Sequence, residues 1–172
     1  DQNALTLAGS SVGSGTFNVT AGSISQTGSV VQQAGAGATS FTANTGSLIL
    51  NNASNDLTGV VSLVNNSASN TSLVESNQLN LGSSTMNGGD LTVTSTNGIN
   101  LTGTTISNNG DMTLTANTGN IQLGRLNAGT GRLTLNAVTG SVLGNNSSIP
   151  DPNTSAAILE ITGAQAVGDF NN

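Results

Sequence analysis

Apolar and polar residues alternate along much of the chain in short runs, and the clearest runs recur at a fixed spacing. Residues 90–94, 111–115 and 132–136 are three such copies, and their first residues are evenly spaced along the chain. Apolar side chains occupy every second position within a copy, which is the period of a β-strand with one buried face. The pattern therefore predicts three equivalent strands that each turn one face to a core. The predicted inward residues are Leu91, Val93, Met112, Leu114, Leu133 and Leu135.

A turn that contains glycine follows each of these strands, and a second short apolar run follows the turn. Glycine at a fixed turn position indicates a backbone conformation with positive φ. The turn glycines, which include one earlier copy, are Gly46, Gly98, Gly119 and Gly140. A third short strand is predicted to carry Met86, Ile106 and Leu126, which are each 20 residues apart. Three short strands per coil of about 20–21 residues, joined by tight turns, indicate a parallel β-helix.

The fold class predicted for residues 1–172 is therefore all-β, as a single right-handed parallel β-helix, or β-solenoid. Residues 53–78 are the least regular part and are predicted to form a longer coil or a loop. Residues 145–157 contain both prolines and are predicted to form a loop. Helices are disfavoured, because Gly, Asn, Thr and Ser are poor helix formers and no window keeps apolar residues at helical spacing.

The first residues of the chain repeat a later stretch at a constant offset. Residues 3–7 match residues 77–81 in this alignment, and residues 17–19 match residues 91–93. The alignment places the first residue in the middle of a repeat. We therefore expect the chain to be a fragment of a longer repeat protein.

The composition narrows the classes of function. Charged residues make up 6% of the chain and the net charge is −6, with only two basic residues. We expect no nucleic-acid binding, because it needs clustered Lys and Arg. The chain has no His and no Cys, so a Ser-His-Asp or Cys-His catalytic group cannot form within it. Since the carboxylates are scattered and aromatic residues are few, we expect no enzyme activity and no catalytic, cofactor-binding or metal-binding residue.

One outward column of charged residues is a candidate for cation binding. Asp90, Asp111 and Arg132 occupy equivalent positions in three successive copies. Two carboxylates about one strand spacing apart are able to share a Ca²⁺ ion, which prefers oxygen ligands. The chain lacks the repeated Gly- and Asp-rich nonapeptide of calcium-binding β-rolls. We therefore favour a solvent-exposed edge at which Arg132 partly neutralises Asp111.

A second outward column is rich in threonine. Thr92 with Thr94 and Thr113 with Thr115 form two Thr-x-Thr rungs, and Asn136 interrupts the third. Flat Thr-x-Thr ladders on a β-solenoid are able to order water and bind ice. Threonine is also a common outward residue of ordinary strands, which is the interpretation we favour.

Three segments resemble the strand repeats of a known family: NDLTGVVSL at residues 55–63, NQLNLG at residues 77–82 and GDLTVT at residues 89–94. They are similar to the repeats of filamentous-haemagglutinin-like large exoproteins, which are exported by two-partner secretion. The closing GDFNN at residues 168–172 also resembles segments found between repeats of that family. The resemblance covers nearly the whole chain and implies the shaft of a right-handed parallel β-helix.

The resemblance also implies a location and a function. It implies a protein that is secreted through an outer-membrane transporter and displayed at the bacterial cell surface as an adhesin. We therefore expect a shaft or adhesion segment that packs against neighbouring coils and supports attachment to a host-cell or bacterial receptor or a glycan. The alternatives are a β-solenoid that itself binds a glycan or ice, and the stem of a contact-dependent inhibition toxin. No cofactor is expected.

Overall fold

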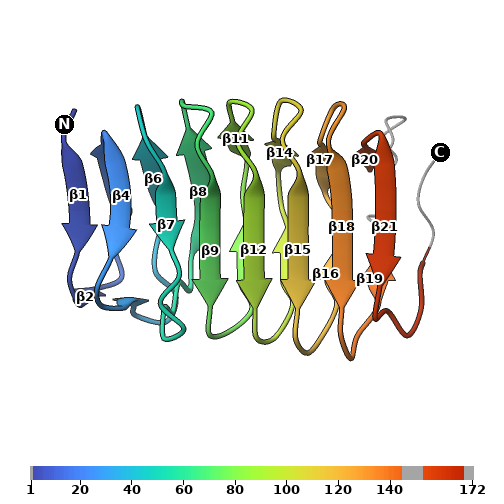
Figure 1. Cartoon of the computed structure of the whole chain (residues 1–172). Coiled ribbons are helices and arrows are strands. Elements are labelled where there is room, and N and C mark those ends of the chain that lie inside the picture. Colours follow the sequence, from blue (N-terminus) through green and yellow to red (C-terminus); the bar gives the residue numbers. More distant parts are fainter. Residues whose placement is uncertain (1, 145–152, 169–172) are drawn as a thin grey trace.

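The computed structural model describes residues 2–144 and 153–168. Its strands stack side by side into one elongated row that runs from β1 at one end to β21 at the other (Figure 1). All regular secondary structure in these residues is β-strand, and every strand pairing is parallel. Among these residues there is no helix with the length and apolar character needed to cross a membrane.

One wall of the row is an eight-stranded sheet to which each coil contributes one strand. In Figure 1 it is the wall nearest the viewer. Its strands, in order along the row, are β1 (Ala4–Leu7), β4 (Ser23–Gln26), β7 (Leu48–Leu50), β9 (Thr71–Glu75), β12 (Leu91–Ser95), β15 (Met112–Ala116), β18 (Arg132–Ala137) and β21 (Ile158–Thr162).

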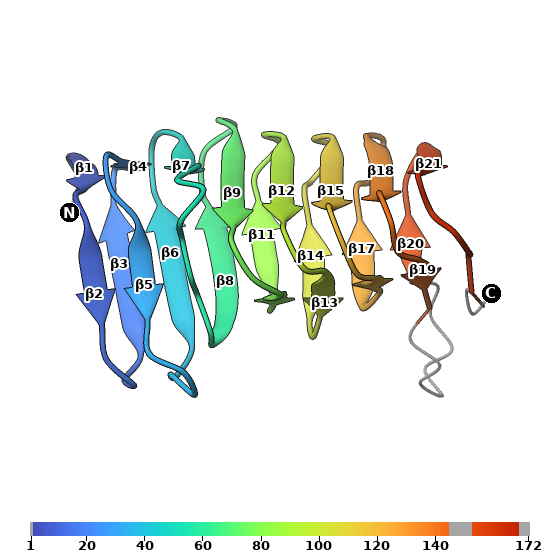
Figure 2. The same ribbon diagram turned by 90° about the horizontal axis from the view of Figure 1, so that it is seen from below.

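The remaining walls are formed by an eleven-stranded sheet and a two-stranded sheet, best seen in Figure 2. The eleven-stranded sheet contains β3 (Phe17–Ala21), β6 (Thr39–Ala43), β8 (Val60–Asn65), β10 (Leu79–Leu81), β11 (Ser84–Met86), β13 (Ile99–Leu101), β14 (Thr104–Ile106), β16 (Ile121–Gln122), β17 (Arg125–Asn127), β19 (Val142–Leu143) and β20 (Thr154–Ser155). The two-stranded sheet pairs β2 (Ser10–Val12) with β5 (Val30–Gln32).

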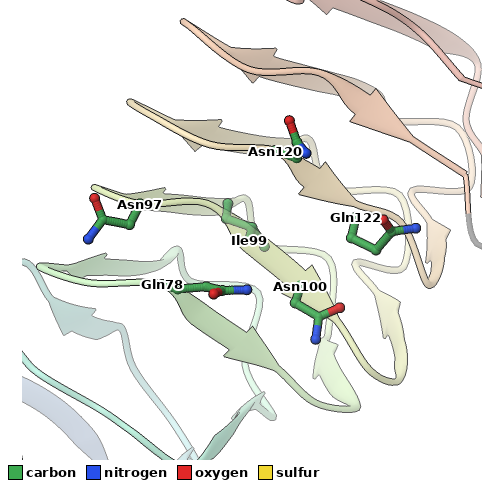
Figure 3. Close-up of a pocket in the computed structure, with 6 residues that line it drawn as sticks. All are labelled: Gln78, Asn97, Ile99, Asn100, Asn120 and Gln122. Atoms are coloured by element: carbon green, nitrogen blue, oxygen red, sulfur yellow. The ribbon is translucent and has the colours of Figure 1, made fainter.

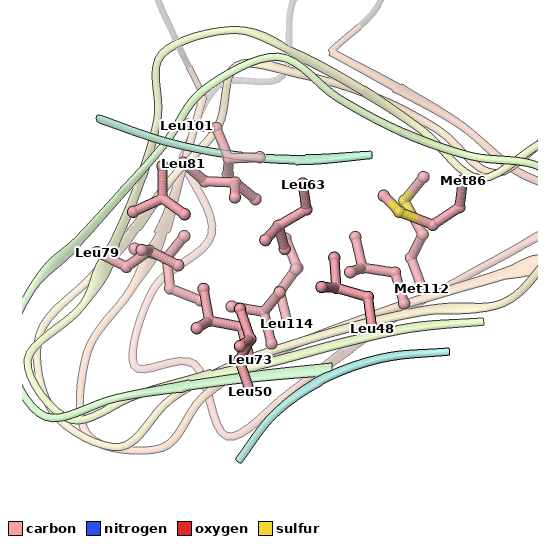
Figure 4. Close-up of a cluster of buried hydrophobic side chains, with 14 of the residues drawn as sticks. Leu48, Leu50, Leu63, Leu73, Leu79, Leu81, Met86, Leu101, Met112 and Leu114 are labelled. Carbon is pink, nitrogen blue, oxygen red and sulfur yellow. The ribbon is translucent and has the colours of Figure 1, made fainter. Parts of the chain in front are cut away.

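The eleven-stranded sheet forks at β8. The start of β8 pairs with β10, where Val61 lies beside Leu81, and its end pairs with β11, where Val64 lies beside Thr85. From β8 onward the sheet therefore continues as two narrow walls, β10–β13–β16–β19 and β11–β14–β17–β20. Each later coil consists of one strand from each of these walls and one from the eight-stranded sheet, which gives the three-sided interior of Figure 4.

The register of the eight-stranded sheet confirms the predicted β-solenoid. Thr71, Leu91, Met112 and Leu133 are aligned in successive coils, so the last two of these coils are equal in length and the first is one residue shorter. The side chains predicted to point inward at 90–94, 111–115 and 132–136 are at most 1% exposed. Figure 4 shows leucine and methionine side chains filling the interior between the walls. Burying one such side chain contributes roughly 1.5–3 kcal/mol, so this column of contacts supports every coil.

Ile106 lies on the predicted third strand, β14, but the spacing of 20 residues does not make it equivalent to Met86 and Leu126. Met86 and Leu126 are fully buried, but Ile106 is half-buried and lies beside Thr85 on the outer side of the wall. The inward position in this coil belongs to Thr105, which is aligned with Leu126. The coil step from β11 to β14 is one residue longer than the pattern predicted, because Ser84 is aligned with Thr105. A displacement of one residue moves a strand side chain to the opposite face.

The equivalences predicted for the first residues are also wrong. Residues 3–7 contain β1, which belongs to the eight-stranded sheet, whereas residues 79–81 form β10 of the eleven-stranded sheet. Residues 17–19 lie in β3, beside β6, and not at positions equivalent to those in β12. The early coils differ in length, since Leu5 is aligned with Ile24, Ile24 with Leu48 and Leu48 with Thr71, which are steps of 19, 24 and 23 residues. A constant offset therefore cannot keep the register.

The two segments predicted to be irregular differ in outcome. Residues 53–78 contain β8 and β9 and complete the long coil that separates Leu48 from Thr71, so they include two paired strands. The predicted loop at 145–157 falls largely on residues 145–152, outside the described residues. Thr154–Ser155 form β20, which pairs with β17.

Candidate functional site

The predicted column of charged residues forms a hydrogen-bond ladder with the backbone. Asp90 Oδ1 accepts the backbone N–H of Asp111 at 3.0 Å, and Asp111 Oδ1 accepts the backbone N–H of Arg132 at 2.8 Å. Asn70 Oδ1 accepts the N–H of Asp90 in the same way at 3.2 Å. In each case a side-chain oxygen of one coil accepts the backbone N–H at the start of the strand in the next coil. The strand pairing leaves this N–H group without a backbone partner.

The column does not form the ion pair that we expected. The Arg132 guanidinium donates to Glu160 Oε2 at 2.9 Å instead of to Asp111. Both partners are nearly half exposed, so this pair contributes little to stability. Within residues 2–144 and 153–168, no group of three or more Asp, Glu, His or Cys side chains is placed to hold a metal ion.

The threonine columns lie on the outer face of the eight-stranded sheet. Thr92 is aligned with Thr113 and then Thr134, and Thr94 is aligned with Thr115 and then Asn136. The neighbouring rungs carry Ser72 with Val74 on β9, and Glu160 with Thr162 on β21. The regular Thr-x-Thr face is therefore limited to β12 and β15.

A buried carboxyl, which the sequence analysis did not identify, lies at the corner after β9. Glu75 occupies an inward position in the same column as Ser95, Ala116 and Ala137 and is fully buried. Its Oε2 accepts the backbone N–H of Leu57 at 3.1 Å, and its Oε1 accepts the N–H of Asn77 at 3.2 Å. The adjacent apolar residues Leu73 and Val74 blur the alternation in the sequence, and only the period of two counted from the inward Leu73 places Glu75 inward.

The electrostatics of this corner favour the neutral form of Glu75. Burial raises the pKa of Glu75 to about 7, although the hydrogen bonds from Leu57 and Asn77 oppose the shift. The nearby negative charge of Asp56 raises the pKa of Glu75 further. The fully buried side chain is out of reach of a substrate, so its arrangement suits a structural role.

Asn55, at the same corner, makes hydrogen bonds to the coils on both sides. Its Nδ2 donates to the carbonyls of Leu50 and Val74 at 3.1 and 3.0 Å, and its Oδ1 accepts the N–H of Val30 at 2.9 Å. Asn55 and Gln26 also exchange two amide hydrogen bonds. A buried amide stabilises a fold only when its donors and acceptors are satisfied, as they are for Asn55.

Glu75 predicts an unusual dependence of stability on pH. A carboxyl with a folded-state pKa above its unfolded value contributes stability that is complete below the unfolded pKa and is lost as pH rises through the folded pKa. The window for Glu75 runs from 4.5 to about 7. We expect the free energy of unfolding to fall by up to about 3 kcal/mol across this window, as measured by urea unfolding at both ends.

Glu75→Gln provides the control, because glutamine does not ionise. The variant should unfold at nearly the same urea concentration at both pH values, whereas the unmodified chain should be more stable at the acidic one. An unmodified chain that is equally stable or more stable at neutral pH would contradict the assignment of Glu75 as a buried, mostly neutral carboxyl.

An open hollow of about 360 Å³ lies on the outside of the wall formed by β10, β13 and β16. Figure 3 shows amide side chains from three successive coils around it. Its lining residues are Gln78, Asn97, Ile99, Asn100, Asn120 and Gln122. No charged side chain lines the hollow, so it presents only neutral hydrogen-bonding groups. Sequence analysis did not identify this feature.

The repeats of the chain match a known family model twice. The model describes repeats of unknown function (DUF5649), and it matches residues 1–64 and residues 68–136. Within residues 1–64 the first strand of the eight-stranded sheet is β1, and within residues 68–136 it is β9. No curated protein and no solved structure matches the chain. Since the two matches together cover most of its residues, the chain belongs to the DUF5649 repeat family.

Proposed function

We propose that the chain is a structural shaft and adhesion segment of a secreted bacterial surface protein. In this role the stacked coils hold a binding part of the protein away from the cell. The observation that carries the proposal is the continuous buried column along the row, in which Val93, Leu114 and Leu135 lie in successive coils and are fully buried. A coil of this kind cannot bury its apolar face alone and is stabilised by the coils on either side.

The pairing of the strands supports a stiff shaft. Every coil from β9 to β17 is paired to its neighbours in all three walls, as β12, β13 and β14 illustrate. Bending the row would stretch parallel hydrogen bonds on at least one wall. The ladder through Asp90 and Asp111 adds side-chain bonds between coils at a corner.

The location and the partners in this proposal come from the resemblance to filamentous-haemagglutinin-like exoproteins. They comprise export through an outer-membrane transporter, display at the cell surface, and a host-cell or bacterial receptor or glycan for the whole protein. The stem of a contact-dependent inhibition toxin would use the same shaft with a different part at its end.

A coil-duplication experiment tests the shaft. Residues 91–132 comprise two complete coils, because Leu91, Met112 and Leu133 are aligned. Inserting a second copy of them after residue 132 keeps the register and should lengthen the row by roughly 10 Å, two strand spacings. Small-angle X-ray scattering measures this length. In a second measurement, bacteria display the chain with a binding tag at its outer end. If the coils act as a shaft, attachment of these cells to a surface that captures the tag should increase with the number of coils.

The matched control inserts a second copy of residues 91–121 at the same place, which is one and a half coils. This insertion puts inward residues on the outer face, so the expected result is loss of the cooperative fold. Attachment that depends on particular outward side chains and not on coil number would contradict the proposed shaft.

A further inference from the structure

The hollow on the β10–β13–β16 wall is bordered by amide side chains from three successive coils. Leu79, Ile99 and Ile121 are aligned in successive coils, so the residues before them also form a column. That column is Gln78, Gly98 and Asn120. Gln78 and Asn120 line the hollow from the two outer coils, and Figure 3 shows Ile99 and Asn100 of the middle coil between them. Gly98 is buried and has a φ of 119°, and a methyl group there would lie 2.9 Å from the carbonyl oxygen of Asn120, so this turn position of the middle coil has no side chain.

Hydrogen bonds inside the chain fix the orientation of the surrounding amides. Asn120 Oδ1 accepts the N–H of Ser141 at 2.9 Å, and Asn100 Nδ2 donates to Asn80 Oδ1 at 3.2 Å. Gln122 Nε2 donates to the carbonyl of Gly144 at 2.8 Å. These bonds leave the other polar atom of each amide available: the Asn120 NH₂ group, Asn100 Oδ1 and Gln122 Oε1.

Two further amides complete the ring. Asn97 Oδ1 accepts the hydroxyl of Thr118 at 3.1 Å, which leaves the Asn97 NH₂ group available. The Gln78 amide makes no side-chain hydrogen bond to any part of the chain that the structure describes, and it is exposed. The hollow therefore presents both hydrogen-bond donors and acceptors, and no charged side chain lines it.

Neutral donors and acceptors match the hydroxyl groups of a sugar, each of which donates one hydrogen bond and accepts others. Phosphate and nucleic acid need cationic partners, and no Lys or Arg lines the hollow. An extended peptide would need a free strand edge for backbone pairing. β13 offers none, because β10 and β16 already pair with its two edges.

We propose that this hollow, the amide notch, is a binding site for a neutral saccharide. Gln78 and Asn120 are two coils apart, roughly 10 Å at the usual strand spacing, which suits a ligand the size of a disaccharide laid along the solenoid axis. Asn100 and Gln122 contact the ligand from one side and Asn97 from the other. No aromatic ring is present to stack on the sugar, so binding is weak, with a Kd on the order of 1 mM.

The test is a titration of the whole isotopically labelled chain with lactose, cellobiose and N,N′-diacetylchitobiose, followed by amide NMR spectroscopy. Saturable shifts of the Gly98, Ile99 and Asn100 signals are expected with at least one of these probes. The double variant Gln78→Ala/Asn97→Ala should weaken that binding about tenfold through loss of hydrogen bonds to the ligand. Both side chains are exposed and the double variant loses only the exposed Asn97–Thr118 bond, so the circular dichroism spectrum should not change and the melting temperature should fall by no more than a few degrees.

The control variant is Asn18→Ala, which removes an exposed amide from the outer face of β3 and should leave the titration unchanged. Three results would overturn the proposal: no saturable shift with any probe, shifts that map to another surface, or shifts that the double variant does not weaken. Equal shifts with a triglycine peptide would indicate a general amide-binding surface and would also overturn it. None of these results affects the coil-duplication experiment, which tests the shaft by the dependence of attachment on the number of coils.

Discussion

Leu114→Asp is expected to abolish the cooperative fold of the chain. Leu114 is fully buried, and it lies between Val93 and Leu135 in the central column of the core. The substitution removes a large apolar side chain, which costs about 2–5 kcal/mol, and leaves a carboxylate without a partner, which adds several more. Single domains are stable by only about 5–15 kcal/mol. Circular dichroism and urea unfolding should show a chain without a cooperative transition.

Thr115→Asp is the matched control, because it places the same charge one residue along the same strand. Thr115 points outward and is half-buried, between Thr94 and Asn136 on the face of the eight-stranded sheet. We expect its melting temperature to stay within a few degrees of the unmodified chain. If Leu114→Asp melted like Thr115→Asp, the assignment of Leu114 to the core would be wrong.

The sequence predicted the β-solenoid best where the coils have equal length. The coil step from Leu91 to Met112 equals the step from Met112 to Leu133, so the strands of the eight-stranded sheet, their inward faces and their order were predicted correctly there. The errors have one physical cause. Alternation along a strand has a period of two, so an offset wrong by one residue, as between Met86 and Ile106, places the two side chains on opposite faces. In the early coils the lengths vary, and no fixed offset holds.

The candidate sites depended on information that one strand alone does not carry. The column of Asp90 and Asp111 was placed correctly, but its role follows from the N–H groups that these carboxylates meet in the next coil. The amide notch requires Gln78, Asn100 and Asn120 to lie on successive coils, which is visible only once the register of β10, β13 and β16 is known. The burial of Glu75 follows only once Leu73 is known to point inward, because the adjacent Leu73 and Val74 leave the inward face of this strand ambiguous in the sequence.

The turn glycines show that glycine serves two different purposes in this fold. Positive φ was predicted correctly at Gly98 and Gly119, where φ is 119° and 74°. Gly46 and Gly140 lie outside the left-handed region, so this part of the prediction was wrong for them. At Gly140 the reason for glycine is space, because a methyl group there would overlap the carbonyl oxygen of Gly119 in the preceding coil.

The same lack of space makes Gly110→Ala a severe substitution. A methyl group on Gly110 would overlap the carbonyl oxygen of Gly89 and lie 2.7 Å from its carbonyl carbon. Gly110 itself meets the next coil in the same way, since a methyl group on Gly131 would overlap the Gly110 oxygen. These are backbone atoms of hydrogen-bonded coils, so the clash is relieved only by moving coils apart. We expect a loss of about 4 kcal/mol or more, above the usual range for overpacking.

Gly13→Ala separates this crowding from the general effect of removing a glycine. No atom lies within 4 Å of a methyl group at Gly13, and neither Gly13 nor Gly110 has a positive φ. Alanine at Gly13 should therefore be neutral or stabilise the chain by up to about 1 kcal/mol, because it restricts the unfolded state. Thermal unfolding should place Gly110→Ala roughly 10 °C or more below Gly13→Ala, as a difference of about 4–5 kcal/mol requires in a chain of this size. Equal melting temperatures would mean that the backbones of successive coils do not approach as closely at this turn as the stacked glycines require.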